Sequence, residues 1–163
     1  MNLAASVEVE APADVIMSVV NDLGTYPRWL DIVGNVRPAD PAEGDPGPAW
    51  SVDLRAQLGP LRRSKRLRMV RSSSDDRSVR FDRRELDGRS HSPWRLSADL
   101  AGPVDASGRA GPADASGPPA LTEVTMRLDY GGTLWLPMLD RLLAEEIRRA
   151  RPRLKAVLES AYQ

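Results

Sequence analysis

The chain has 163 residues, a length typical of one compact domain with its own hydrophobic core. It contains no cysteine and a single histidine, which excludes Cys/His zinc sites, iron–sulfur clusters, thiol nucleophiles and disulfides. Its 23 basic and 23 acidic residues give a formal net charge of zero, so no overall field attracts nucleic acid or anionic membranes.

The sequence also lacks the usual signals for membrane insertion and secretion. No stretch approaches the roughly 18 consecutive apolar residues of a membrane span. Residues 1–6 lack the basic region and apolar run that open a secretion signal. We therefore expect a cytoplasmic protein with no membrane span, no nucleic-acid partner, no cofactor and no metal, although a cation site built from carboxylates alone stays open.

The N-terminal part of the chain predicts one strand followed by two short helices. Apolar and acidic residues alternate towards the end of Leu3 to Glu10, which is the pattern of a strand with one wet face. Pro12 ends this strand, and apolar residues recur at helical spacing from Ala13 to Val20. A second short helix is expected over Tyr26 to Leu30, with Thr25 as its N-cap.

The middle of the chain predicts a meander of antiparallel strands. Residues 38–48 contain four prolines and two glycines and are expected to form a loop. Beyond this loop, apolar and polar residues alternate in successive runs that are separated by turn sequences such as Gly59-Pro60 and Asp87-Gly88. The expected strands cover residues 50–58, 61–71, 79–82, 94–100 and 121–130.

Residues 102–119 interrupt the strand pattern with a tract rich in Gly, Pro, Ala, Ser and Asp, in which the segment 102–108 is nearly repeated at 111–117. Such a composition buries too little apolar surface to offset the entropy of ordering the chain. Because the strand pattern resumes at residue 121, we interpret the tract as a flexible hairpin loop inside a single domain that spans residues 1–163.

The strongest helical signal lies near the C-terminus, from about Trp135 to Tyr162. Leucine, isoleucine, valine and alanine residues recur there every three or four positions and form one apolar stripe. Pro152 falls inside this segment, where it is expected to kink the helix or divide it.

Helices and strands are segregated along the chain, which is typical of the α+β class. The apolar stripe of the last helix is buried most simply if a curved antiparallel sheet of six to seven strands wraps around it. Two short helices then follow the first strand, and the Tyr26–Trp29 segment closes one end of the structure.

Several short motifs occur in the order and spacing of a known family. They are Ala11-Pro12-Ala13 with Val15, Asp22, Tyr26-Pro27-Arg28-Trp29, Thr122-Glu123-Val124 with Leu128 and Tyr130, and Leu154-Lys155 with Leu158-Glu159. In these features, across about residues 5–160, the sequence resembles the START-like or SRPBCC superfamily, which includes polyketide cyclase/dehydrase-like and lipid-transport proteins. The long 102–119 tract and Pro152 depart from the family pattern.

The resemblance implies a helix-grip fold, in which the sheet and the long helix leave an elongated apolar cavity. Fold alone does not fix function, because some members of this superfamily are enzymes and many only bind or carry a ligand. We therefore expect a protein that binds or carries a hydrophobic small molecule, either a lipid or a polyketide-like compound. Two alternatives stay open: a cofactor-independent polyketide cyclase, dehydratase or aromatase, and a regulatory module that binds a protein partner or forms a homodimer.

Most of the aromatic residues lie on the faces of the expected strands and helices that point inward. Such rings suit an apolar pocket with a few polar groups, although each ring taken alone also fits ordinary core packing. The aromatic candidates for ligand binding are Tyr26, Trp29, Trp50, Phe81, Trp94, Tyr130 and Trp135. The aliphatic candidates on the expected inward faces are Leu54, Leu67, Met69, Met126, Met138, Leu139 and Leu142.

Three basic residues, Arg63, Lys65 and Arg83, extend the same inward faces. An inward cation binds a carboxylate, or in a cyclase polarises a carbonyl and protonates an enolate. The alternative is that these side chains reach water or pair with Asp82 or Glu85. The resemblance implies an arginine acting with a pocket tyrosine in aromatase/cyclases, but no catalytic residue carries over to this sequence, and the catalytic residues stay unassigned.

Two further motifs favour structural interpretations. His91 lies between two expected strands and is interpreted as a solvent-exposed loop residue near the cavity rim. Residues 62–68 form a basic cluster of the kind that binds polyanions. Because apolar residues alternate with the basic ones, a wet strand face is the better interpretation, with Asp53, Asp82 and Asp99 as cross-strand partners.

Overall fold

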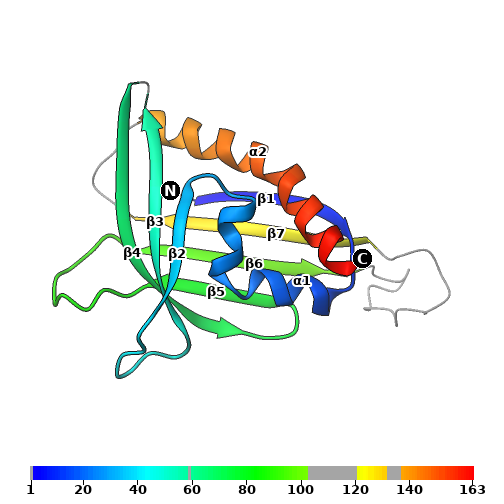
Figure 1. The fold of residues 1–163 in the computed structure, drawn as a ribbon, viewed down its shortest axis with the longest axis horizontal. Helices are drawn as coiled ribbons and strands as arrows, with labels where there is room; N and C mark the ends of the chain where they lie inside the picture. The colour runs from blue at the N-terminus through cyan, green and yellow to red at the C-terminus, as the bar shows by residue number, and fades with distance from the viewer. Residues whose placement is uncertain (1, 59, 103–120, 132–136) are drawn as a thin grey trace.

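A computed structural model describes residues 2–58, 60–102, 121–131 and 137–163, without the side chains of residues 57, 58, 61 and 137–140 (Figure 1). Seven strands form one antiparallel sheet in the order β1-β7-β6-β5-β4-β3-β2. The strands are β1 (Asn2–Glu10), β2 (Val33–Ala39), β3 (Ala49–Leu58), β4 (Leu61–Ser74), β5 (Ser78–Arg83), β6 (Trp94–Ala101) and β7 (Leu121–Tyr130). The helices are α1 (Ala13–Val20), the 3-10 helix η1 (Leu23–Arg28) and α2 (Pro137–Tyr162).

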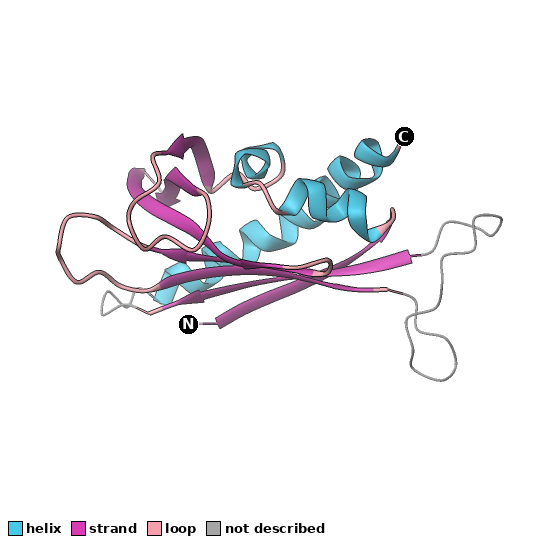
Figure 2. Cartoon of the chain, turned by 90° about the horizontal axis from the view of Figure 1, so that it is seen from below, coloured by secondary structure: helices cyan, strands magenta, loops and turns pink. Residues whose placement is uncertain are grey.

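This architecture confirms the predicted α+β helix-grip fold, with two short helices after the first strand and a curved sheet. Two bulges bend the sheet: β2 shifts register between Val33 and Asn35, and β4 shifts register between Arg71 and Ser73. As a result β2, β3 and the start of β4 run across the direction of β1, β7 and β6 (Figure 1). The three helices lie on one side of the sheet (Figure 2).

The second short helix differs from its prediction in position, type and cap. It is a 3-10 helix that begins at Leu23, three residues earlier than expected, and Asp22 rather than Thr25 caps it. The Asp22 carboxylate accepts a hydrogen bond from the backbone N–H of Gly24 at 2.8 Å. Thr25 instead donates its hydroxyl to the carbonyl of Val19 at 2.8 Å. The sequence contained both capping residues, and Asp22 acts as the cap because the turn starts directly after α1.

Helix α2 is continuous over 26 residues, so Pro152 does not divide it. Pro152 and Arg148 both lie on the exposed face of the helix. Because proline has no backbone N–H, the carbonyl of residue 148 has no donor at residue 152, and on this exposed face water takes the place of that donor. The C-terminal half of α2 contacts β1 and α1, and its buried residues there include Leu154 and Leu158.

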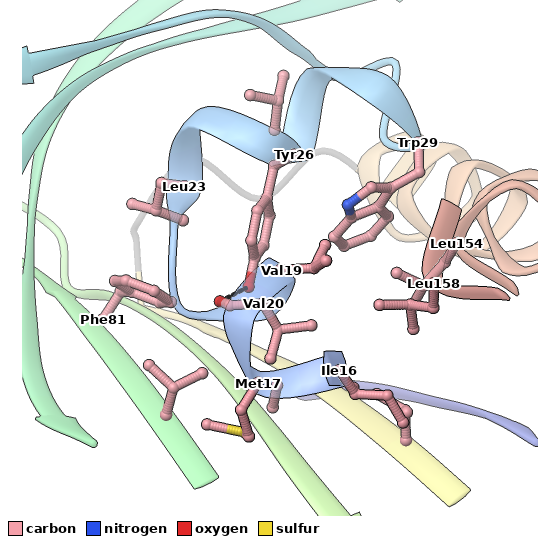
Figure 3. Packing of buried hydrophobic residues seen from close by; sticks show 14 of the residues in the cluster. Ile16, Met17, Val19, Val20, Leu23, Tyr26, Trp29, Phe81, Leu154 and Leu158 are labelled. Atoms are coloured by element: carbon pink, nitrogen blue, oxygen red, sulfur yellow. Dashed lines mark hydrogen bonds between the residues drawn. The ribbon is translucent and has the colours of Figure 1, made fainter. Parts of the chain in front are cut away.

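The hydrophobic core joins all three helices to the sheet (Figure 3). Tyr26 lies at its centre, with its ring edge-on to Phe81 at 6.2 Å and tilted against Trp29 at 4.7 Å between ring centroids. The Tyr26 hydroxyl donates a hydrogen bond to the carbonyl of Val20 at 2.9 Å. This bond fixes η1 against α1, so the turn that follows η1 is held in a defined position over the sheet.

The outer face of the sheet carries the cross-strand ion pairs expected of a wet surface. Asp53 accepts a hydrogen bond from Arg66 at 2.7 Å, as the interpretation of the 62–68 cluster predicted. Asp82 and Asp99 pair instead with arginines from other strands: Asp82 with Arg95 at 2.7 Å, and Asp99 with Arg127. Basic residues in this sheet are therefore partly balanced by carboxylates on neighbouring strands.

One ion pair on this outer side is buried. Arg68 and Asp45 lie 2.7 Å apart, and their side chains are only 10% and 6% exposed. Arg68 also donates to the carbonyl of Asp40 at 2.9 Å. The proline-rich loop between β2 and β3 is thus docked onto β4, and it covers an arginine that the strand pattern alone places in water.

Candidate functional site

Two small apolar cavities lie between the sheet and the helices. The first, of about 70 Å³, separates α2 from β1 and β7. Its lining includes Val7, Trp29, Val124, Met126, Ala150 and Leu154. The second, also of about 70 Å³, lies between η1 and the middle of the sheet. Its lining includes Leu23, Tyr26, Leu54, Leu67, Met69 and Trp94.

The two cavities share one wall of aliphatic side chains. Its members are Leu30, Ile32, Leu96, Leu128 and Leu143. Three of them come from the turn after η1 and from α2, and the other two come from the sheet. The two cavities are therefore adjacent, between η1, α2 and the sheet.

A wider, charged hollow lies beside these cavities, between the tip of the β3–β4 hairpin and the first half of α2. We call this hollow the vestibule; its volume is about 610 Å³. Ile32 and Leu143 line the vestibule as well as both cavities. The vestibule therefore borders both cavities at Ile32 and Leu143.

Four arginines and three carboxylates line the vestibule. They are Arg55, Arg62, Arg63, Arg149, Asp31, Glu145 and Glu146. Each carboxylate already has partners: Glu145 pairs with Arg148 and Arg149, Asp31 pairs with Arg153 at 2.6 Å, and Glu146 accepts backbone N–H bonds. Arg62 and Arg63 have no carboxylate partner in the described part of the chain.

The structure places the predicted site residues in four groups. Trp29 and Met126 line the first cavity, and Tyr26, Leu54, Leu67, Met69 and Trp94 line the second. Arg63 and Leu142 line the vestibule. Trp50, Lys65, Phe81, Arg83 and Tyr130 line neither cavity nor the vestibule. Trp135 lies outside the described residues, as do the side chains of Met138 and Leu139 and most of the 102–119 tract.

Arg83 takes part in a network at the C-terminal end of β5. Its Nε donates to Glu85 at 2.7 Å, and its side chain is 5% exposed. One of its other nitrogens lies 3.3 Å from Nδ1 of His91, whose Nε2 is 2.8 Å from Asp87. Burial, and then the nearby positive charge of Arg83, lowers the pKa of Lys65. The pairing with Glu85 was one of the alternatives predicted for Arg83, and it directs the guanidinium to the loop after β5.

The hydroxyl of Tyr26 is also committed to the fold. Burial raises the pKa of this phenol well above its ordinary value, and the negative charge of Asp22 raises it further. The hydroxyl remains protonated and bonded to Val20. Tyr26 therefore contributes its ring to the second cavity and does not offer a titrating group to a ligand.

Two buried indole N–H groups, those of Trp29 and Trp94, have no hydrogen-bond acceptor within the described residues. The Trp29 nitrogen points towards the ring of Tyr26, a weak acceptor (Figure 3). Trp94 lines the second cavity and has the ring of Tyr130 at 4.7 Å. In apolar pockets, ligands are oriented by a few polar groups, and an indole N–H is a group of this type.

Sequence reasoning missed several residues of the site. The shared wall and Ala150 were not selected, and neither were Arg55 and Arg62. Leu143 and Ala150 do belong to the apolar stripe of the last helix, and that periodicity could have identified them. Leu30 and Ile32 lie in an irregular turn, where no periodicity marks the inward side.

The residues that the structure describes contain neither a metal-binding cluster nor a membrane-spanning helix. No group of three or more His, Cys, Asp or Glu side chains in the described ranges has an arrangement suited to a metal ion. None of the helices described here combines the length and the apolar character needed to cross a membrane.

The fold and site define a helix-grip protein with apolar space between its sheet and its long helix. The chain belongs to the family described as polyketide cyclase/dehydrase and lipid transport, which its sequence matches over residues 1–159. No curated protein sequence matches the chain.

Solved structures show the same fold at low sequence identity. A START superfamily protein from Mycobacterium smegmatis is 19% identical, with a TM-score of 0.61 over 98% of this chain and 97% of that one. A protein from Thermus thermophilus is 14% identical, with a TM-score of 0.63 and full coverage of both chains (100% each). The di-domain ARO/CYC BexL from the BE-7585A biosynthetic pathway is 14% identical, with a TM-score of 0.57 over 96% of this chain and 49% of that one.

Proposed function

We propose that this protein binds or carries an apolar small molecule, a lipid or a polyketide-like compound, between the sheet and α2. The observation that carries the proposal is the pair of apolar cavities that share one wall and meet the vestibule at Ile32 and Leu143. Membership of a family that includes lipid-transport proteins supports it. In this proposal residues 1–163 act as one domain.

The cavity volumes define the size of the proposed ligand. A cavity of about 70 Å³ has room for about five water-sized groups, so the two together accept an apolar chain of about ten carbon atoms. The lining is almost entirely apolar, which favours a hydrocarbon or lightly oxygenated body over a sugar or nucleotide.

A second function, that of a cyclase, dehydratase or aromatase, is favoured by the family description alone. The candidates for such chemistry were Arg63 or Arg83 acting with Tyr26 or Tyr130. Arg83 is held by Glu85 away from both cavities, and the Tyr26 hydroxyl is bonded to Val20. These contacts remove Arg83 and Tyr26 from such a role, leave Arg63 with Tyr130 as the remaining candidate pair, and support binding as the first proposal.

Titration calorimetry with decan-1-ol tests the proposal. We expect saturable binding of one molecule per chain and a negative heat-capacity change, because apolar surface leaves water. Native mass spectrometry of the protein as purified should show an apolar compound that decan-1-ol displaces. The proposal would be rejected if decan-1-ol did not bind and the native mass spectrum showed the protein with no bound compound.

A further inference from the structure

We propose that the ligand is an amphipathic anion, whose apolar body occupies the two cavities and whose acidic head group lies in the vestibule against Arg62 and Arg63. This inference rests on the proposed function, because it assigns a head group to the ligand of the same site. It commits to one chemical class: an apolar chain or ring system that ends in a carboxylate or a phosphate.

The geometry of the vestibule supplies the first argument. An apolar ligand that enters from solvent passes the surface where Ile32 and Leu143 line both the cavities and the vestibule. A body of about ten carbons fills the two cavities, so any further polar group on the ligand remains in the vestibule. The vestibule, at about 610 Å³, is large enough for a hydrated head group.

The distribution of charge supplies the second argument. The three carboxylates of the vestibule are each held by groups of the protein: Glu145 by arginines of α2, Asp31 by Arg153, and Glu146 by backbone N–H groups. Arg62 and Arg63 have no such carboxylate in the described part of the chain. An acidic head group is the complement that these two guanidinium groups lack.

The packing of Arg55 supports the same assignment. This third arginine lies over Gly34, where a Cβ atom on residue 34 would come within 2.3 Å of the Arg55 Nε. The absence of a side chain at Gly34 therefore gives the stem of Arg55 a fixed place beside the vestibule. Three arginines from β3 and β4 thus line the same hollow, with Arg63 on the inward face of the hairpin and Arg55 and Arg62 on its outer face.

Calorimetry with three matched probes tests the inference: decan-1-ol, decanoate and decyl phosphate, each at pH 7.5 and low salt. We expect at least one of the two anions to bind about fivefold to tenfold more tightly than decan-1-ol, an advantage set by partly exposed ion pairs. A preference for decanoate or for decyl phosphate identifies which acidic group the vestibule takes. The advantage should shrink at 0.5 M salt, where such pairs are screened.

Two variants locate the effect. Arg62→Gln combined with Arg63→Gln should remove the advantage of the anion and leave decan-1-ol binding unchanged. Arg80→Gln is the control, because Arg80 is an exposed strand arginine that lines neither the cavities nor the vestibule. It should leave all three affinities unchanged.

The outcomes separate this inference from the proposed function. Equal affinities of the alcohol and both anions would overturn the inference and leave the proposed function standing. An advantage of the anion that survives the double substitution would overturn the assignment to Arg62 and Arg63. Failure of all three probes to bind would reject the proposed function, and the inference with it.

Discussion

The carboxylate of Glu146 accepts a hydrogen bond from the backbone N–H of Asp31 at 2.6 Å. The same oxygen accepts a second bond from the N–H of Ile32 at 3.3 Å. Arg153, two turns further along α2, pairs with the side chain of Asp31 at 2.6 Å. Helix α2 is therefore tied to the turn between η1 and β2 at the position where Ile32 separates the vestibule from the cavities.

Glu146→Ala should loosen this turn. The two amides lose their acceptor, so we expect faster hydrogen exchange at Asp31 and Ile32, and a loss of about 1 kcal/mol in the free energy of unfolding for a partly exposed charged acceptor. Exchange measured by mass spectrometry or NMR checks the result. Glu145→Ala is the control, since Glu145 pairs with arginines of its own helix. Equal protection of Asp31 and Ile32 in both variants would contradict the role given to Glu146.

Tyr26→Phe should reduce stability and keep ligand binding. The change removes the hydroxyl from the buried bond at 2.9 Å and leaves the carbonyl of Val20 without that donor. We expect a loss of about 1–2 kcal/mol in the free energy of unfolding, measured by urea denaturation. Decan-1-ol affinity should stay within twofold, because the ring still lines the second cavity. A loss of binding without a loss of stability would show that the hydroxyl serves the ligand.

The Arg68–Asp45 pair predicts a pH-dependent contribution to stability. The hydrogen bond from Arg68, followed by that from the N–H of Ala42, lowers the pKa of Asp45 from 3.8 to about 2. Since the folded pKa lies below the unfolded one, the stabilisation is complete above about pH 5 and is lost as the pH falls towards 2. Asp45→Asn should therefore lower the Tm by about 5 °C or more at pH 7, because it leaves Arg68 unpaired.

The difference in Tm between the wild type and Asp45→Asn should shrink steadily from pH 5 to pH 2.5, as measured by scanning calorimetry. Asp76→Asn provides the control, because Asp76 is exposed and forms no ion pair in the described structure. Its Tm should follow that of the wild type at every pH. A difference for Asp45→Asn that is the same at pH 7 and pH 2.5 would contradict the assigned ion pair.

Local patterns predicted most of the regular elements of this fold, but not β2 (Val33–Ala39), whose last two residues fall in the expected 38–48 loop. Alternation identified the strands that carry Trp50, Leu67 and Phe81 on one face, and the three-to-four-residue spacing identified α2. Those signals depend on neighbours within one element, so they do not require knowledge of tertiary contacts. The order of elements then allowed one economical arrangement, the sheet around the helix.

Features that depend on contacts between distant segments were not predictable in the same way. Arg68 lies on the wet face of its strand by pattern, but the loop containing Asp45 covers it. Arg83 continues an inward face, and Glu85 in the following loop holds its guanidinium beside that loop. Ile32 closes the cavities from a turn without periodicity. In each case a loop, whose path the alternation of residues does not encode, decides the environment.

The central claim, that an apolar molecule occupies the space between the sheet and α2, is tested most directly by filling that space. Ala150 is 4% exposed and lines the first cavity, so Ala150→Leu puts three further carbon atoms there. Ala144→Leu adds the same atoms to the exposed face of the same helix. Calorimetric titration of both variants with decan-1-ol should show at least a tenfold weaker affinity for Ala150→Leu and wild-type affinity for Ala144→Leu. Wild-type affinity in Ala150→Leu, with the variant folded, would contradict the claim.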